Sequence, residues 1–574
     1  MERLSSPIDQ LKDNYQVVVV GSGYGGGIAA SRLARAGQQV CLLERGRELQ
    51  PGEYPNTLDA ALREFQVDTS VGTVGSRTGL YDLRVNPDIN VFFGCGLGGT
   101  SLVNANVGLR PEPRVFDDPR WPRAIRDDLD RGVNDGYHHA EEMLKPTPYP
   151  ADFPPLLKLQ ALEKSARAMG QEFYRPPIYV TFKEGVNHVG VEQHACVLCG
   201  DCISGCNYGA KNTVLMNYLP DAKNHGAEIY TEVSVRYLER KDDRWLVHYQ
   251  LLESGNEPID APTRVLAADV VVLAAGTLGS TELLLRSKAR GLPLSDQVGQ
   301  RFTGNGDYLG FSYNGESPVN TTGYGSMPPG EIDPVGPNIA GIIDMRGQPR
   351  LEDGIVVEEG VAPGAFAPAL AESYASAAAA AGQNTADDLA DRLEQAERAA
   401  ESLVRGAYHG AVLNTQVFLV MTHDDGTGRM YLENDRLRVS WPGVGDQPIY
   451  QKVSQRLLEA TKALKGIFTP NPLWKDLAGH NLTTVHPLGG CVMAEDAAWG
   501  VVNHKAQVFA DTTGDAVHEG LYVADGAIVP IPLGVNPSLT ISALAERACA
   551  LLAQDRGWQI DYSLPASVSA DEPR

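Results

Sequence analysis

Four polar residues in the second half of the chain could take part in a proton transfer, either as a base or by holding the hydroxyl group that loses the proton. His486 lies in a turn rich in proline and glycine, and Asn536 precedes Pro537 and a helical pattern. A neutral histidine can accept the proton of a hydroxyl group, while an asparagine amide can hold the same oxygen. Glu358 and Glu359 are neighbours in a strand-like run, where side chains alternate between faces, so only one can face a given site. Either glutamate could be a base or a plain surface charge, and Asn536 could simply cap the helix that follows it.

A second reactive group is a cluster of four of the eight cysteines, packed into eleven residues: Cys196, Cys199, Cys202 and Cys206. The spacing is that of a bacterial-ferredoxin-type iron–sulfur loop, in which short intervals let several thiolates converge on one cluster. The proline that usually follows the fourth cysteine is absent, because Asn207 stands there. Three interpretations stay open: an iron–sulfur cluster, a zinc site, and reduced thiols or disulfides without a metal.

The elements that would position a cofactor begin near the N-terminus. Residues 15–20 predict a strand buried on both faces of a parallel sheet, followed by the turn GSGYGG, a helical pattern and a second strand that ends before Glu44. In such a unit Gly21 permits the tight turn, Gly23 lets a pyrophosphate approach the backbone, and Gly26 lets the helix pack close to the strand. The helix N-terminus attracts phosphates, and Glu44 is placed to accept hydrogen bonds from ribose hydroxyls. This pattern predicts dinucleotide binding without distinguishing FAD from NAD.

Further glycine-rich segments follow in a definite order: the loop 92–104, the strand and turn 270–280, the turn 486–490, the strand 521–527 and the segment 534–538. In this order they resemble the glucose–methanol–choline (GMC) oxidoreductase family, and most of all its branch of cholesterol oxidases and long-chain alcohol oxidases. The likeness is thin between residues 300 and 475, where the substrate would be recognised. The loop also reads Asn104-Ala105-Asn106 where steroid oxidases of the family have glycines after the asparagine, which leaves the shape of the cavity open.

The resemblance implies that the cofactor is FAD. The residues that would bind its ADP half are Gly21, Gly23, Tyr24, Gly25, Gly26, Glu44 and Val233. The remaining cofactor contacts would be Gly99, Thr100, Asn104, Asn106, Val107, Gly276, Asp525, Gly526, Pro537 and Ser538. It also implies that His486 and Asn536 position and deprotonate a hydroxyl group while a hydride moves to the flavin, with Glu358 or Glu359 as a further base.

The predicted reaction is therefore oxidation of a small apolar alcohol, secondary or long-chain and with sterols included, to the carbonyl compound. The electrons would pass to oxygen or to an electron-transfer partner. Two alternatives stay open: a lyase or decarboxylase on the same scaffold, and a dehydrogenase that passes electrons through an iron–sulfur cluster to an acceptor other than oxygen.

We predict an α/β (α+β) fold, with a Rossmann-like FAD-binding domain and an inserted substrate domain built on a mostly antiparallel sheet with helices. The FAD-binding domain would comprise residues 14–297, which include the cysteine-rich loop, and residues 476–560 with the catalytic pair. The substrate domain would span 298–475, with a helical insert at 366–407. The insert would pack its apolar face on this domain, or serve as a lid or membrane contact. Residues 561–574 form a tail.

Composition narrows the class of protein further. Of the 574 residues 43% are hydrophobic and 21% charged, as in globular enzymes, and the formal net charge of −23 argues against nucleic-acid binding. The polar first 14 residues show no signal peptide, and no run of about 18 apolar residues predicts a transmembrane helix. A cytoplasmic protein is the expectation.

Overall fold

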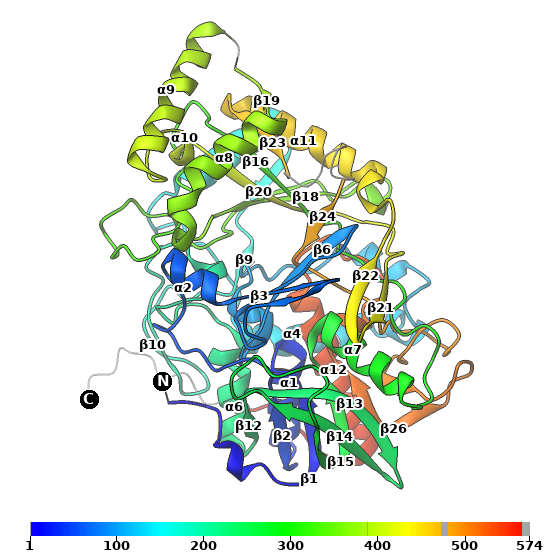
Figure 1. Ribbon diagram of the computed structural model, residues 1–574. Helices are drawn as coiled ribbons and strands as arrows, with labels where there is room; N and C mark the ends of the chain where they lie inside the picture. Colours follow the sequence, from blue (N-terminus) through cyan, green and yellow to red (C-terminus); the bar gives the residue numbers. More distant parts are fainter. Residues whose placement is uncertain (1, 387, 472–479, 565–574) are drawn as a thin grey trace.

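A computed structural model describes residues 2–386, 388–471 and 480–564 (Figure 1). Its largest sheet has eight strands and lies in the lower half of Figure 1. The central strand β1 (Asn14–Val20) pairs in parallel with β2 (Val40–Leu43) and with β15 (Arg264–Leu273). Parallel pairing extends to β12 (Glu228–Tyr230) on one side and β26 (Val517–Val523) on the other. The antiparallel strands are β13 (Val233–Lys241), β14 (Arg244–Leu251) and β25 (Gln507–Phe509). Distant parts of the chain therefore build one sheet.

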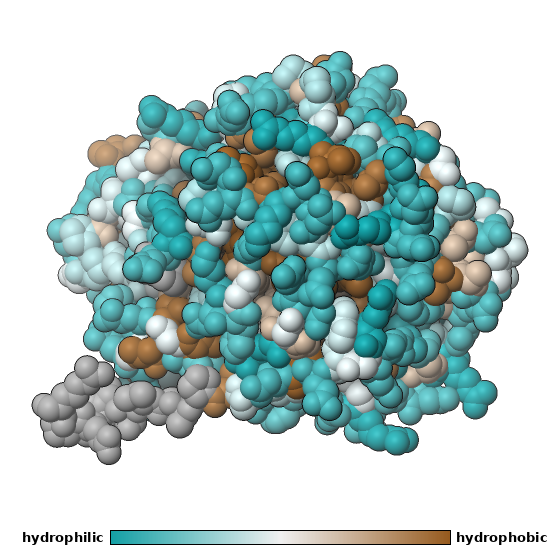
Figure 2. Space-filling view, turned by 90° about the horizontal axis from the view of Figure 1, so that it is seen from below, coloured by the Kyte–Doolittle hydropathy of each residue, from teal (hydrophilic) through white to brown (hydrophobic). Residues whose placement is uncertain are grey.

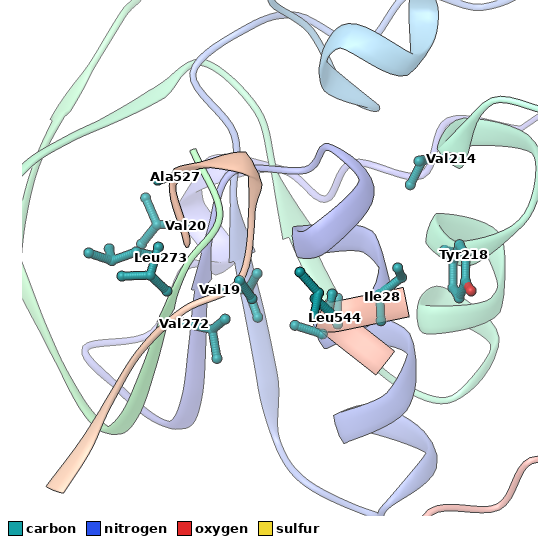
Figure 3. Packing of buried hydrophobic residues seen from close by; sticks show 14 of the residues in the cluster. Val19, Val20, Ile28, Val214, Tyr218, Val272, Leu273, Ala527 and Leu544 are labelled. Carbon is teal, nitrogen blue, oxygen red and sulfur yellow. The ribbon is translucent and has the colours of Figure 1, made fainter. Parts of the chain in front are cut away.

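The strand and helix predicted at the N-terminus are both present. Residues 17–20 of β1 are almost fully buried, as expected for an apolar strand with parallel neighbours on both sides. The helix α1 (Tyr24–Arg35) begins at the glycine turn and packs against the sheet. In Figure 3 the side chain of Ile28 of α1 lies between those of Leu544 and Tyr218, with Val19 of β1 on the side of Leu544. These two residues belong to α6 (Tyr218–Asn224) and α12 (Ser538–Arg556), which pack against α1, and α4 (Asn134–Leu144) packs against α12.

A smaller sheet of five strands lies between the two halves of the molecule (Figure 1). Its strands are, in spatial order, β24 (Leu482–Thr484), β6 (Ile89–Gly94), β5 (Tyr81–Arg84), β3 (Phe65–Thr69) and β4 (Gly72–Val74). The edge strand β24 ends two residues before His486, so this sheet fixes the turn that carries the histidine. The helix α7 (Gly276–Ala289) packs on β13 nearby.

The upper half of Figure 1 contains a seven-stranded sheet in which every pairing is antiparallel. Its order is β19 (Gln383–Asn384), β23 (Ile467–Pro470), β16 (Tyr308–Tyr313), β20 (Gln416–Met421), β18 (Val356–Gly360), β17 (Ile342–Asp344) and β8 (Glu172–Tyr174). The helices α5 (Leu157–Met169) and α11 (Pro448–Leu464) pack together and against it. The fold class predicted from the sequence is confirmed. The substrate domain was predicted to begin at residue 298, but its sheet also includes β8, which lies at residues 172–174.

The helical insert forms α8 (Ala367–Ala381) and α9 (Leu389–Arg405), joined to the short α10 (Gly410–Leu413). Its first helix packs on the substrate domain as expected, with Tyr374 of α8 against the rings of Phe311 and Tyr313, but α9 does not pack an apolar face. On α9 the polar Gln395 and Ser402 are buried, because Gln395 and Arg398 form hydrogen bonds with Asn314 and other groups beneath the helix. The exposed apolar residues of α9 are Leu389, Leu393, Leu403 and Val404.

The remaining elements are short. They are α2 (Leu58–Arg63), α3 (Arg123–Arg126), β7 (Thr147–Pro148), β9 (Pro177–Ile178), β10 (Gly185–Val186), β11 (Glu192–Gln193) and the hairpin β21 (Arg429–Glu433) and β22 (Arg436–Ser440). Seen from below, the surface is mostly hydrophilic, with small apolar groups between charged ones (Figure 2). In the part of the chain that the structure describes, no helix is long and apolar enough to cross a bilayer. The predicted tail lies within the described residues only as far as 564.

Candidate active site

A cavity of about 720 Å³ runs from the glycine turn of α1 to the loops that carry His486 and Asn536. Its wall contains eighteen of the residues predicted for the site: Gly21, Gly23, Tyr24, Gly25, Glu44, Gly99, Thr100, Asn104, Asn106, Val107, Val233, Gly276, His486, Asp525, Gly526, Asn536, Pro537 and Ser538. Gly26, Glu358 and Glu359 are not on the wall. The structure therefore gathers segments that lie up to 517 residues apart in the sequence.

The glycine turn has the geometry of a pyrophosphate cradle. Gly21 has φ +94°, in the left-handed region where glycine is favoured. A Cβ atom on Gly26 would lie 2.0 Å from the carbonyl oxygen of Gly21, so only glycine lets α1 start this close to the turn. At Gly23 a Cβ atom would meet no protein atom within 4 Å, which leaves open space above the N-terminus of α1. Phosphate oxygens fit there, since the first N–H groups of the helix point at them.

Polar groups along the cavity also fit an FAD molecule. Glu44 is buried and accepts hydrogen bonds from Ser22 N, Ser22 Oγ and Gly46 N. Asn104 Nδ2 donates to the hydroxyl of Tyr24 at 2.6 Å, next to the turn. The side-chain oxygen of Asn106 is fully buried and accepts no hydrogen bond from the described residues, so it is free to meet a polar edge of a ligand. These residues would hold FAD in an extended pose across the cavity.

Gly23→Ala provides a direct test of this cradle. Because no protein atom lies near the new methyl group, the fold should be unaffected, while the methyl group takes the place of the phosphates. We expect FAD affinity to fall by at least about tenfold with an unchanged melting temperature of the apoprotein. Gly347→Ala, at another open glycine outside the cavity, is the matched control. Equal FAD affinities for the two variants would contradict the assignment.

His486 is held by an aspartate that the sequence reasoning missed. Asp307 Oδ1 lies 2.8 Å from His486 Nδ1, and Asp307 Oδ2 accepts hydrogen bonds from the backbone N–H groups of Val485 and His486. Burial of the imidazole disfavours its charged form, but Asp307 and, more weakly, Glu358 outweigh this effect and raise the pKa of His486. With Nδ1 engaged by a carboxylate, Nε2 is the nitrogen left to exchange a proton in the cavity.

Asn536 points its amide at a buried carboxyl group. Its Nδ2 donates to Glu358 Oε2 at 3.2 Å, whereas its own Oδ1 and Glu358 Oε1 are buried with no partner among the described residues. Burial raises the pKa of Glu358 to about 8, against the opposing effects of Asn536 and His486. The helix α12 starts at Ser538 with Pro537 as its N-cap and without a side-chain cap. Asn536 therefore does not cap this helix, and the alternative prediction is wrong.

The two adjacent glutamates have different partners. Both are on β18 and fully buried, and strand alternation turns them to opposite sides. Glu358 meets Asn536, but Glu359 accepts two hydrogen bonds from Lys158 Nζ, at 2.6 and 2.8 Å, on α5. Lys158 Nζ also donates to the carbonyl groups of Pro337 and Asn338. Glu359 thus belongs to a buried ion pair that holds the substrate domain together, and it does not reach the cavity.

The structure does not support a metal site at the cysteine cluster. Within the described ranges, no three His, Cys, Asp or Glu side chains come close enough to hold a metal ion, and all eight thiols are free. Burial raises the pKa values of Cys196, Cys199 and Cys202, so without a metal these groups are thiols. The described residues therefore give no support to the iron–sulfur and zinc interpretations of Cys196, Cys199, Cys202 and Cys206, whose thiols are free in this structure.

The cysteine loop instead connects the domains. The Asp201 carboxylate accepts hydrogen bonds from Gly325 N and Gly364 N of the substrate domain. Lys211, fully buried, donates to the carbonyl groups of Cys202, Leu102 and Asn104 and so ties this loop to the cavity wall. On the described contacts, this segment links loops of the substrate domain to the loop of Leu102 and Asn104 at the cavity wall.

One short loop positions both candidate catalytic segments. Asp307 fixes the turn at His486, and Asn305, fully buried, fixes the segment before Asn536. Asn305 Nδ2 donates to Val535 O, while its Oδ1 accepts from Leu533 N and Gly534 N. The available signal was the run TGNGD before a predicted strand, because glycines next to amide and acid side chains favour a tight, hydrogen-bonded turn.

Comparisons with known proteins agree with this geometry. A family model for the N-terminal part of GMC oxidoreductases matches residues 24–304, and the model for the C-terminal part matches 381–545. Together they cover more than half of the chain. The chain belongs to the GMC oxidoreductase family, as the sequence resemblance predicted. It is accordingly an FAD-dependent oxidoreductase that acts on the CH–OH group of its donor.

Two cholesterol oxidases are among the similar proteins. That of Mycobacterium tuberculosis is 28% identical, over 94% of this chain and 91% of its own length, and that of Acinetobacter baumannii is 27% identical over 93% and 94%. A long-chain-alcohol oxidase of Arabidopsis thaliana is 24% identical over 92% of this chain and 66% of its own. Among solved structures, pyridoxine 4-oxidase from Mesorbium loti shares the fold with a TM-score of 0.58, 16% identity and coverage of 94% and 99%.

Proposed function

We propose that this enzyme oxidises an apolar secondary or long-chain alcohol, with sterols among the candidates, to the carbonyl compound and passes the electrons to oxygen. The observation that carries the proposal is that His486 and Asn536 line the same cavity as an apolar part of its wall, while Asn536 donates to Glu358, whose pKa is also affected by His486. That part consists of Val107, Ile203, Leu309, Val361, Val417 and Leu419. Similarity to cholesterol and long-chain alcohol oxidases, which match over most of the chain, points to the same class of substrate.

In this mechanism the alcohol hydroxyl lies between His486 and Asn536. His486, neutral and with Nδ1–H donated to Asp307, accepts the hydroxyl proton at Nε2. Asn536 holds the oxygen through its amide, and Glu358 fixes the orientation of that amide and can take up a proton as a second base. When bound, FAD supplies the acceptor for the carbinol hydride. The apolar wall excludes water, which strengthens each of these polar contacts.

Anaerobic reduction of the bound flavin tests the proposal. Cholesterol and a long-chain primary alcohol should bleach the flavin absorbance, whereas a short polar alcohol should react far more slowly. Air should then restore the oxidised spectrum faster than a one-electron dye does. If no alcohol bleaches the flavin, the proposal is wrong and a lyase or decarboxylase reaction becomes the alternative. Reoxidation by the dye alone would show a dehydrogenase.

A further inference from the structure

The cavity continues beyond the predicted cofactor contacts into a region lined by arginines. We call the six arginines of this region the arginine wall: Arg45, Arg77, Arg84, Arg236, Arg286 and Arg436. They come from the strands β5 and β13, the helix α7, the hairpin strand β22 and the loops after β2 and β4. Arg236 and Arg286 are 6% and 3% exposed, so water screens their charges only weakly.

The acids in this region do not neutralise the arginine wall. Four of them share the lining: Asp68, Asp82, Glu257 and Glu282. Behind the lining, Arg438 and Asp435 add one charge of each sign. Asp82 forms ion pairs with Arg45 and Arg84, and Asp68 forms ion pairs with Arg84, Arg436 and Arg438. Asp435 forms ion pairs with Arg236 and Arg286. Arg286 also forms an ion pair with Glu282. Without Glu44, which lines the same cavity beside Arg45 at the predicted ribose contact, the region keeps an excess of two positive charges in a protein whose net charge is −23.

Arg77 carries the clearest part of this excess. Its guanidinium donates only to neutral groups, namely Ser234 Oγ, Gln250 Oε1 and the carbonyl of Glu257, and in the described structure no carboxylate lies within ion-pair distance of it. Burial, together with repulsion from neighbouring arginines, lowers the pKa of Arg77 and of Arg236 to about 10. A pair of buried guanidiniums that repel each other in a cavity is stabilised by an anion between them.

Two arginines of the wall lie well beyond the predicted cofactor contacts on their own elements. Arg286 is ten residues beyond Gly276 on α7, a distance of about 15 Å along the helix axis at 1.5 Å per residue. Arg236 is three residues beyond Val233 on β13, about 10 Å along the strand. Gly276 and Val233 are themselves predicted cofactor contacts, and the cradle for the phosphates is the turn at Gly23. Arg286 and Arg236 therefore lie beyond these predicted contacts, while Arg45 directly follows Glu44, the predicted ribose contact.

We infer that the arginine wall is a second anion site, which binds a doubly charged phosphoryl group next to the adenine end of FAD. Guanidinium groups are suited to this ligand because their planar N–H donors match phosphate oxygens. The ligand is either inorganic phosphate or the phosphate of a small ester. The site is separate from the alcohol-binding side of the cavity, so it does not depend on the proposed oxidation.

The test is calorimetric titration of the FAD-loaded protein with inorganic phosphate in a chloride buffer of constant ionic strength. We expect saturable binding of one phosphate per chain. Arg77→Gln removes the positive charge without leaving a buried carboxylate unpaired, and it should weaken phosphate binding by at least about tenfold. The matched control is Arg175→Gln, because Arg175 also donates only to carbonyl groups and lies outside the cavity. Its phosphate affinity should equal that of the unmodified protein.

Adenosine monophosphate in the same titration distinguishes the two sources. Tighter binding than that of inorganic phosphate supports an ester, and weaker or equal binding supports the free ion. Three results would overturn the inference: no phosphate binding to the FAD-loaded protein, equal affinities for Arg77→Gln and Arg175→Gln, or loss of FAD from Arg77→Gln. The last result would mean that the arginines serve the phosphates of FAD. Flavin reduction by alcohol, measured on the same variants, reports separately on the proposed oxidation.

Discussion

Glu358→Gln is expected to lower kcat/KM for the alcohol by about 10²- to 10⁴-fold without unfolding the protein. Glutamine keeps the shape of the side chain and an oxygen for Asn536, but it cannot take up a proton. The pKa of Glu358 is raised to about 8 in the folded protein, so the folded state resists ionisation of this carboxyl group more than the unfolded state does. The free energy of unfolding therefore falls as the pH rises from the lower unfolded-state pKa to about 8. The glutamine variant cannot ionise, so its melting temperature at pH 8 should equal or exceed that of the unmodified enzyme.

Glu359→Gln, one residue along, is the matched comparison. It leaves the Lys158 ammonium buried without its counter-charge, which costs about 3–5 kcal/mol of folding free energy. Steady-state kinetics should therefore show the larger loss of activity for Glu358→Gln. Thermal denaturation should show the larger loss of stability for Glu359→Gln. A Glu358→Gln enzyme with full activity would remove this residue from the mechanism. Equal stability of Glu359→Gln and the unmodified protein would mean that the ion pair is not needed for folding.

The sequence predicted the nucleotide-binding half well because its signals are local. The strand before Gly21, the turn itself and the acid at Glu44 follow one another within 30 residues, so spacing alone defines the unit. The order of the later glycine-rich segments then identified the family. For the same reason the seven-stranded sheet was predicted only as a class: its strands pair across long separations, and β8 joins it from residue 172.

Local patterns failed where the decisive partner is remote. Alternation along β18 could not tell Glu358 from Glu359, because both faces of the strand are buried and the choice is made by Asn536 and Lys158. The cysteine spacing left a metal loop open as one of three interpretations, whereas the described contacts of the loop are with the substrate domain, where Gly325 N and Gly364 N donate to the carboxylate of Asp201. The partner of His486 lies 179 residues before it, so no motif around the histidine could reveal it.

Asp307→Asn is expected to lower kcat by about 10²-fold or more, because it removes the group that fixes the imidazole of His486. The aspartate accepts a hydrogen bond from Nδ1–H, whereas an asparagine amide can donate a hydrogen bond to Nδ1 and so leave the proton on Nε2, which then cannot act as the base. Asp424→Asn is the control: this buried carboxylate, which follows β20, accepts hydrogen bonds from Thr303 Oγ1 and Gly304 N of the same loop but forms no hydrogen bond or ion pair with His486 in the described structure. Steady-state kinetics should show a much smaller loss for it.

The pH profile distinguishes a catalytic effect from mere disturbance of the loop. Asp307 raises the pKa of His486, and the imidazole must be neutral to accept a proton, so kcat/KM of the unmodified enzyme should rise with pH through that pKa. Without the carboxylate the charged form loses its partner, and the rising limb should move to lower pH in Asp307→Asn. It should stay in place in Asp424→Asn, whose mutated group does not face His486. An unchanged limb in Asp307→Asn, with the same fall in kcat, would show that the aspartate only shapes the turn and that another group, with Glu358 the first candidate, takes the proton.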